Sequence, residues 1–172
     1  MHFQEVQYAH QNWVARLAML AIFAGWLFAL YGFIQQIFLG HTFGDNPSSD
    51  GELIFFTAFS TVIFLGVLVL LGFSRLETQV LEEGIALSYL PFLKRRVYRW
   101  DELQSAEIRK YNPIREYGGW GWRRGWGKKG WVYNVSGNMG LQLIFKDGRR
   151  ILIGTQRPDD LEQAIYIARP RR

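Results

Sequence analysis

The sequence predicts an α+β membrane protein: a hairpin of two transmembrane helices, followed by a strand-rich domain that ends in one helix. Two long apolar runs lie close together in the first half of the chain. Short segments of alternating apolar and polar residues follow them, separated by turn signals, and the last segment is amphipathic with helical spacing. We therefore divide the chain into a helical hairpin over residues 1–74 and a soluble domain over residues 75–172.

The two apolar runs are long enough to cross a bilayer. Residues 14–39 contain one charged residue, Arg16, and residues 53–73 contain none. At about 1.5 Å per residue these helices extend for about 39 and 31 Å, against a hydrocarbon core of about 30 Å. A pair of buried helices in a soluble bundle is the alternative, but uncharged runs of this length are rare in soluble domains. A signal peptide fits poorly, because the first run is too long and is not preceded by basic residues.

The distribution of charge predicts the orientation of the hairpin. The connection over residues 40–52 contains Asp45, Asp50 and Glu52 but no Lys or Arg. The chain after the second run holds 19 of the 20 basic and 11 of the 15 acidic residues, a formal charge of about +8. The positive-inside rule therefore places the connection outside and both termini in the cytoplasm. Ser49 and Glu52 have the spacing of a capping box, which predicts a helix start at this point.

Small residues recur along one face of the first span. Ala21, Gly25 and Ala29 are four positions apart, a spacing that allows helix backbones to approach closely. We expect this row to pack against the second span or against another subunit. The alternative is chance, because Ala and Gly are common in transmembrane helices.

Strand and turn signals fill the soluble half. Glu82-Glu83-Gly84 and Asp147-Gly148 are hairpin turn signals. Residues 158–168 predict a helix, because apolar residues recur at helical spacing and Pro158 suits the first helical position. The seven expected strands cover residues 76–81, 85–90, 95–100, 103–111, 131–135, 141–145 and 149–154.

Three stretches of the soluble half resemble a known family. They are YNPIREYGGWG at residues 111–121, YNVSGN at 133–138 and LIGTQRP at 152–158. In these residues the chain from Arg75 to Ala168 resembles the pleckstrin-homology-like (PH-like) domains that follow one or two spans in small bacterial membrane proteins of uncharacterised function. The resemblance implies an antiparallel β half-barrel capped by the C-terminal helix, in a protein of the bacterial inner membrane. It implies little about activity.

The segment from Gly118 to Trp131 is the strongest candidate for a binding surface. Tryptophan is enriched at membrane interfaces, and a Lys or Arg near anionic headgroups contributes about 1 kcal/mol. We expect a loop that enters the cytoplasmic leaflet or receives a partner, with Trp131 in the core. The alternative is a loop packed on its own domain, with its indole rings in the core. The candidate binding residues are Trp120, Trp122, Arg123, Arg124, Trp126, Lys128 and Lys129.

A second basic run is a weaker candidate for headgroup binding. Eukaryotic PH domains hold phosphoinositides with basic residues around the first hairpin, whereas the first expected hairpin here carries Glu82 and Glu83. Lys94, Arg95 and Arg96 in the next loop are a substitute for that site or a basic juxtamembrane patch.

Nucleotides and nucleic acids are poorly supported as ligands. Residues 125–130 match G-x-G-x-x-G, but no βαβ unit surrounds them. Interleaved Arg and Trp also occur in proteins that bind single strands, but the positive-inside rule already explains the charge. We therefore expect no nucleic-acid partner.

Residues for enzymatic chemistry are sparse. The chain has no Cys, and its histidines are His2, His10 and His41, so the soluble half lacks the commonest general base and metal ligand. Adjacent acidic residues occur only at turns and a helix start, where they are structurally expected. We therefore expect no catalytic residue, no metal and no cofactor.

These observations predict a membrane-anchored adaptor or scaffold that binds a protein partner, or a second copy of itself, at the cytoplasmic leaflet. One alternative is a module that senses anionic lipid. Another is an accessory subunit of a larger membrane complex, in which the helical hairpin is the docking surface.

Overall fold

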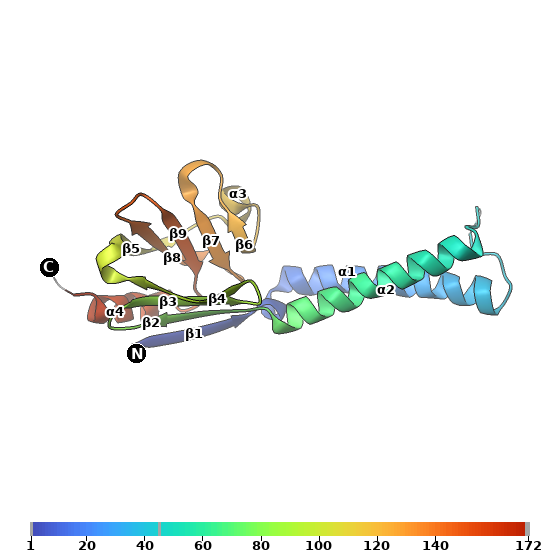
Figure 1. Ribbon diagram of the computed structural model, residues 1–172, viewed down its shortest axis with the longest axis horizontal. Coiled ribbons are helices and arrows are strands. Elements are labelled where there is room, and N and C mark those ends of the chain that lie inside the picture. The colour runs from blue at the N-terminus through green and yellow to red at the C-terminus, as the bar shows by residue number, and fades with distance from the viewer. Residues whose placement is uncertain (1, 45, 171–172) are drawn as a thin grey trace. The chain divides into compact units, whose positions relative to one another are not determined.

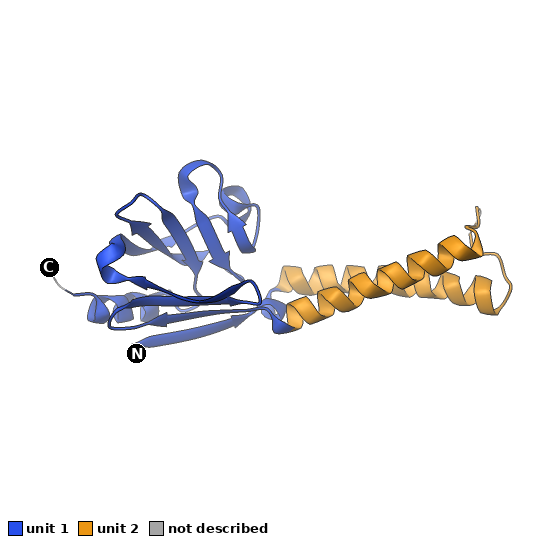
Figure 2. Ribbon diagram, viewed as in Figure 1, with its two compact units in different colours: residues 1–12, 73–172 blue, residues 13–72 orange. Residues whose placement is uncertain are grey.

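The computed structural model describes residues 2–44 and 46–170, and these form two compact units. The helical unit spans residues 13–72, and the strand unit combines residues 1–12 with residues 73–172 (Figure 2). The expected boundary after residue 74 therefore lies close to the observed one. The first twelve residues, which we had assigned to the hairpin, belong instead to the strand unit.

The helical unit consists of two helices that match the expected spans. α1 (Trp13–Phe33) continues into a π-helical turn, Ile34–Phe38, and α2 covers Asp50–Phe73. Both helices are long and apolar enough to cross a membrane, by length and composition.

The capping box at the start of α2 is confirmed. The Ser49 backbone N–H donates to Glu52 Oε2 at 3.0 Å, and the Glu52 N–H donates back to Ser49 Oγ at 3.4 Å. Asp45, part of the acidic connection, lies outside the described residues.

A strand that the sequence analysis missed begins the strand unit. β1 (Phe3–Tyr8) pairs antiparallel with β2 (Arg75–Val80) along its whole length, from Phe3 opposite Val80 to Tyr8 opposite Arg75. Its inward residues are Phe3, Glu5 and Gln7, all buried. Because two of the three are polar, β1 lacks the apolar alternation that predicts a strand.

β1 and β2 belong to a four-stranded antiparallel sheet in the order β1-β2-β3-β4 (Figure 1). β3 spans Gly84–Leu90 and β4 spans Leu93–Arg99, with an irregularity in their pairing between Leu87 and Tyr89. The hairpin that carries Glu82 and Glu83 therefore joins the second and third strands of this sheet, not the first two.

The second sheet has five strands in the order β5-β8-β9-β7-β6. Its pairs are antiparallel except β7 with β9, which is parallel. The Asp147-Gly148 turn between β8 and β9 is confirmed, because Phe145 N–H donates to the Arg149 carbonyl at 2.9 Å across it. The bounds are β5 Leu103–Lys110, β6 Gly121–Arg124, β7 Trp131–Asn134, β8 Met139–Phe145 and β9 Arg150–Gly154.

Both sheets and the last helix contribute to one apolar core. Leu76 and Ile85 of the first sheet, Leu141 and Leu143 of the second, and Leu161 of α4 belong to the same buried cluster. α4 (Pro158–Ala168) matches the predicted helix and buries its apolar stripe, and a short helix, α3 (Pro113–Tyr117), follows β5.

A buried polar network ties β1 to the start of α4. Glu5 Oε2 accepts from Thr155 Oγ1 at 2.6 Å, and Glu5 Oε1 accepts from the Gln156 N–H at 2.7 Å and from Gln7 Nε2 at 3.0 Å. Gln7 Nε2 also donates to the Gly154 carbonyl at 2.9 Å. Buried polar groups are tolerated when they are hydrogen-bonded, so these bonds account for Glu5 and for the amide nitrogen of Gln7, while Gln7 Oε1 is buried without a partner.

Candidate interaction surface

The Trp-rich segment is a hairpin. We expected a loop over residues 118–131, but part of it forms β6, which pairs antiparallel with β7 in a register that places Trp122 opposite Tyr133. The Gly125 N–H donates to the Gly130 carbonyl at 2.7 Å and closes the pair. The segment is therefore an ordered extension of the second sheet, and its side chains have defined faces.

The tryptophans of this hairpin lie mainly at the surface. Trp122 and Trp126 are 44% and 70% exposed. Trp120 is half-buried, and its Nε1–H donates to the Gly137 carbonyl at 3.0 Å. The prediction that Trp131 lies in the core is wrong, because this residue is 42% exposed at the first position of β7.

Three exposed aromatic side chains form a continuous row, which we call the aromatic patch: Phe92, Trp122 and Trp131. The ring centroids of Phe92 and Trp122 are 6.1 Å apart, and those of Trp122 and Trp131 are 5.7 Å apart. Buried Tyr89 supports the row from beneath, with its ring 5.9 Å from that of Phe92. Contiguous exposed apolar surface of this kind marks interaction sites.

The aromatic patch lies at a defined end of the first sheet. Phe92 is in the turn after Leu90, and Leu90 is opposite Arg75, which is itself opposite Tyr8. α2 ends at residue 73, so Ser74 alone separates it from β2, and α1 begins five residues after Tyr8. The patch is thus at the end of the sheet where the chain connects to both long helices.

Sequence reasoning missed Phe92 as a member of this surface. A large apolar residue in a short turn between two strands is out of place in a solvated connection, and this was the available signal. The partner rings lie about thirty and forty residues further along the chain, so the row itself could be recognised only once the strands were paired.

Cations of the Trp-rich hairpin divide into two groups. Arg123, Arg124 and Lys128 are exposed. Lys129 instead forms an ion pair with Glu116, with Nζ 3.4 Å from Oε2. Of the four cations predicted to bind, Lys129 therefore has a carboxylate partner, and Arg123 Nε donates to the Trp120 carbonyl at 2.8 Å. Arg124 and Lys128 are exposed at the hairpin surface.

The second basic run lies on β4, an edge strand. Lys94, Arg95 and Arg96 are all exposed there. Burial raises the pKa of Tyr133 on β7, and the guanidinium of Arg96 acts in the opposite direction. Tyr133 is buried and lies opposite Trp122 in the pairing of β6 with β7.

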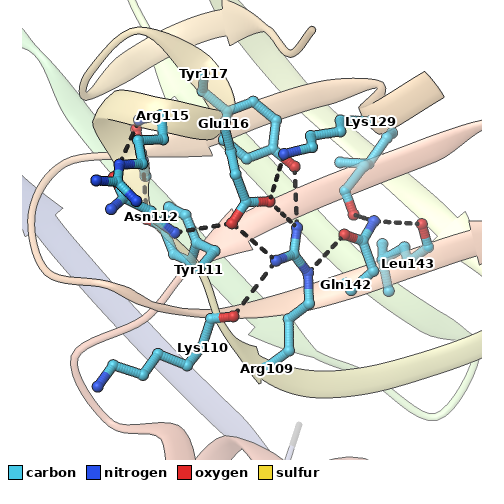
Figure 3. A network of polar contacts seen from close by, with 12 residues as sticks. Arg109, Lys110, Tyr111, Asn112, Arg115, Glu116, Tyr117, Lys129, Gln142 and Leu143 are labelled. Carbon is cyan, nitrogen blue, oxygen red and sulfur yellow. Dashed lines mark hydrogen bonds and ion pairs between the residues drawn. The ribbon is translucent and has the colours of Figure 1, made fainter. Parts of the chain in front are cut away.

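A polar network fixes the base of the Trp-rich hairpin (Figure 3). The carboxylate of Glu116 on α3 accepts a hydrogen bond from Arg109 Nη2 of β5 at 3.0 Å and another from the Asn112 backbone N–H at 2.8 Å. Arg109 Nε also donates to Gln142 Oε1 at 3.0 Å. Lys129 Nζ lies 3.4 Å from Oε2, the same carboxylate oxygen that Arg109 Nη2 contacts. Glu116 therefore joins β5, α3 and the Trp-rich hairpin through one side chain.

The network stabilises the charged form of Glu116. Burial raises the pKa of this carboxyl, but the hydrogen bond from Arg109, the Asn112 N–H and the charges of Arg109 and Lys129 together hold it below its ordinary value. The Glu116 carbonyl also accepts the Trp126 N–H at 3.2 Å. The backbone and the side chain of Glu116 thus both hold the hairpin in place.

Within residues 2–44 and 46–170, no three His, Asp or Glu side chains gather closely enough to hold a metal ion. Burial is the main cause of the raised pKa of five tyrosines: Tyr89, Tyr98, Tyr111, Tyr117 and Tyr133. The expectation that this chain performs no catalysis stays a prediction.

Two members of the row of small residues on α1, Ala21 and Gly25, are exposed, and Ala29 is half-buried. A Cβ built on Gly25 meets no atom within 4 Å, and Ala21 is exposed. The helices meet through aromatic residues: the ring centroids of Trp26 and Phe64 are 5.0 Å apart, and Trp26 Nε1 donates to Thr61 Oγ1 at 2.9 Å. The packing of Ala21, Gly25 and Ala29, against the second span or against another subunit, stays a prediction.

Comparisons with protein-family models, with curated proteins and with solved structures find no match to this chain.

Proposed function

We propose that this protein is a membrane-anchored adaptor. α1 and α2 span the bacterial inner membrane with both termini in the cytoplasm, and the strand unit is a PH-like domain held at the cytoplasmic leaflet. There it binds a protein partner or a second copy of itself.

The strand order supports the PH-like part of this proposal. β1-β2-β3-β4 and β5-β8-β9 are two antiparallel meanders, and α4 follows them. An antiparallel arrangement with a final helix is what the resemblance implies. These seven strands differ from the seven expected ones, because β1 is included and β7, which pairs parallel with β9, is not. Two insertions interrupt this order: the helical unit lies between β1 and β2, and the Trp-rich hairpin lies between β5 and β8.

The position of the aromatic patch carries the proposal. With α2 as a span, Ser74 brings β2 directly to the bilayer surface, and the turn that holds Phe92 belongs to the same end of the sheet. Tryptophan and phenylalanine at the headgroup level bury apolar rings while the indole N–H stays hydrated. The patch would thus fix the domain against the leaflet, which leaves the remaining surface of the domain for partners.

A depth measurement tests this arrangement. The sequence has no Cys, so Phe92→Cys and Asp147→Cys each accept one spin label in the full chain, reconstituted in vesicles that contain anionic lipid. We expect the label at residue 92 to contact a lipid-soluble relaxing agent and the label at residue 147 to contact only a water-soluble one. Equal access of the water-soluble agent to both labels would contradict the proposal.

The exposed cations Arg123, Arg124 and Lys128 favour one competing function, the sensing of anionic lipid. The same labels distinguish it from anchoring. A sensor leaves the surface in neutral vesicles or at high salt, because surface charge is screened beyond about 8 Å at physiological ionic strength. An anchored domain keeps its depth under both conditions.

A further inference from the structure

The turn that joins β7 to β8, residues 135–138, is a meeting point of four parts of the chain. Each of its four backbone carbonyls accepts a hydrogen bond from a segment that is distant in sequence. The Ser136 carbonyl accepts from Gln156 Nε2 at 2.9 Å, the Gly137 carbonyl from Trp120 Nε1 at 3.0 Å, the Asn138 carbonyl from the Tyr111 N–H at 2.8 Å, and the Val135 carbonyl from Asn12 Nδ2. We call these four residues the junction turn.

The four donors of these bonds stand just before four different elements. Asn12 directly precedes α1, and Trp120 directly precedes β6 of the Trp-rich hairpin. Tyr111 follows β5 and leads into α3, while Gln156 leads into α4. A movement of the junction turn therefore acts on the starts of all four elements together.

The bond from Asn12 connects the junction turn to α1. Asn12 belongs to the strand unit, is 5% exposed, and is followed at once by Trp13, the first residue of α1. Its backbone N–H also donates to the Ala9 carbonyl at 3.1 Å, which holds the residue from a second direction. Because a buried donor that loses its acceptor is costly, a shift of the first residues of α1 pulls the junction turn with it or breaks this bond.

Two further bonds continue from the junction turn to the Trp-rich hairpin. The Trp120 indole N–H donates to the Gly137 carbonyl, and the Gly121 N–H donates at 2.8 Å to Oδ1 of Asn134, the residue before the turn. Asn134 is fully buried. Both bonds hold the first residues of the hairpin, and Trp122 of the aromatic patch follows directly on β6. A short series of hydrogen bonds thus links the start of α1 to the patch.

Bilayer thickness is a change to which α1 must respond if it is a span. α1 and its π-helical turn form a continuous helix of 26 residues, which extends for about 39 Å against a hydrocarbon core of about 30 Å. A span that is longer than the hydrocarbon core tilts, and its tilt increases as the bilayer becomes thinner. The first residues of α1 follow this tilt, and Asn12 is attached to them.

We infer that the junction turn couples the tilt of α1 to the order of the Trp-rich hairpin, so that bilayer thickness controls how the aromatic patch is presented. This inference rests on the proposed function, in which α1 is a span and the patch lies against the leaflet, and it adds the regulation of that same surface. Coupling between two sites is reciprocal, so a partner bound at the hairpin also shifts the preferred tilt of α1.

Amide hydrogen exchange of the full chain in bilayers of different thickness tests this inference. The protein is reconstituted in vesicles of phosphatidylcholine with short, medium or long acyl chains and a constant fraction of anionic lipid. We expect the amides of β6 to exchange about fivefold faster in the thinnest bilayer than in the thickest, which is the equilibrium effect of one hydrogen bond of ordinary strength. The central amides of β8 should exchange at the same rate in every bilayer.

Two variants separate α1 from the junction turn. Asn12→Ala removes the bond to the Val135 carbonyl, and Gly-Gly inserted between Asn12 and Trp13 keeps this bond but gives α1 a flexible connection. In both variants β6 should exchange at one rate in all bilayers. Gln156→Ala is the matched control, because it removes a side-chain amide bond to the next carbonyl of the same turn from a segment that leads to α4. This control should keep the dependence of the wild type.

Exchange of β6 that does not change with bilayer thickness in the wild type would overturn the inference. A dependence that survives in Asn12→Ala or in the Gly-Gly insertion, or that is lost equally in Gln156→Ala, would also contradict it. A change in β8 parallel to that in β6 would assign the effect to destabilisation of the whole strand unit.

The spin label at residue 92 keeps failure of this inference distinct from failure of the proposed function. A label that stays at lipid depth while β6 shows no dependence leaves the anchored adaptor standing and removes the coupling. A label that is exposed to water contradicts the anchoring, whatever β6 shows.

Discussion

Glu116 is the side chain on which the position of the Trp-rich hairpin most depends. Its carboxylate forms ion pairs with Arg109 and Lys129 and accepts a hydrogen bond from the Asn112 N–H. Its backbone carbonyl accepts a hydrogen bond from the Trp126 N–H. Removing the negative charge would leave Arg109 without its carboxylate partner in a site where the Glu116 side chain is 17% exposed. Hydrogen bonds to charged groups are worth about 1.5 to 3 kcal/mol, so the effect should be measurable.

We predict that Glu116→Gln loosens the hairpin without unfolding the domain. Amide exchange at Trp126 should speed up by about tenfold or more, while β8 amides keep their protection. Asp147→Asn is the matched control, because Asp147 also pairs with an arginine but is 52% exposed, and exposed pairs contribute about 0 to 1 kcal/mol. Equal exchange rates at Trp126 in Glu116→Gln and the wild type would show that the network does not hold the hairpin.

We also predict that the contribution of the Glu116 carboxylate to holding the Trp-rich hairpin depends on pH. Its pKa in the folded protein lies below the ordinary value of 4.5, so its contribution is fully present above that pH and is lost as the pH falls through the folded pKa. The difference in Trp126 exchange between wild type and Glu116→Gln should therefore disappear in acid. A difference that stays constant down to low pH would assign the effect to another group.

Individual residues were the least predictable part of the surface. The composition of the Trp-rich segment indicated a surface role for Trp122 and Trp126, and both are exposed. Trp131 was misplaced because its position at a strand start suggested the core, whereas its exposed ring lies 5.7 Å from that of Trp122, with the two ring planes tilted by 32°. Phe92 lies beside these tryptophans only in the folded protein, and the pattern of residues along the chain does not indicate which distant residues become neighbours.

At the scale of elements, β1 determines which part of the chain can fold alone. It covers β2 along its whole length and contributes buried Phe3 and Glu5. A fragment of residues 75–172 would expose the edge of β2 and leave Thr155 and the Gln156 N–H without their acceptor. Unsatisfied buried polar groups cost about 1 to 3 kcal/mol each, and a lost core phenylalanine costs about 3 to 5.

We predict that β1 restores this fragment when it is joined directly to β2. Tyr8 and Arg75 are opposite each other, so replacing residues 9–74 with Asn-Gly gives a two-residue hairpin turn. The joined chain should be soluble and unfold cooperatively in urea, whereas residues 75–172 alone should aggregate or unfold at a much lower urea concentration. Equal stability of the two would mean that β1 is dispensable.

Gly25 provides a test of the row on α1. A side chain at this position meets no neighbour within the chain, so Gly25→Leu should leave the hairpin folded and inserted. If the row packs against a second copy, the larger side chain should separate the helices and reduce dimerisation measured by energy transfer between labelled chains in vesicles. Ile63→Leu on α2 changes shape but not size, and serves as the control. Dimerisation that is unaffected by Gly25→Leu would exclude this face.

Most of the elements could be predicted from the sequence. The two long helices, the strands with apolar alternation, the β8–β9 turn and the stripe on α4 all follow from local pattern. β1 and β6 could not, for different reasons: β1 turns polar residues inward, and β6 consists of Gly, Trp and Arg in a segment whose glycines indicate a loop. Both become strands because a partner strand is present, which is tertiary information.

For the whole molecule, both connections between the two units lie at one end of the strand unit. That end holds Tyr8, Arg75 and the aromatic patch, and it connects to both long helices. The insertion of the helical unit between two paired strands makes this possible, because both connections to the proposed spans leave from one end of one sheet.

Cysteine accessibility in intact cells tests the central claim, a membrane hairpin with its strand unit in the cytoplasm, most directly. The sequence has no Cys, so Asn46→Cys in the connection and Glu82→Cys in the β2–β3 turn each provide one exposed thiol. We predict that an impermeant thiol reagent labels residue 46 in intact cells and labels residue 82 only after the membrane is opened. Labelling of residue 82 in intact cells, or release of the unlabelled chain from membranes by high salt alone, would contradict it.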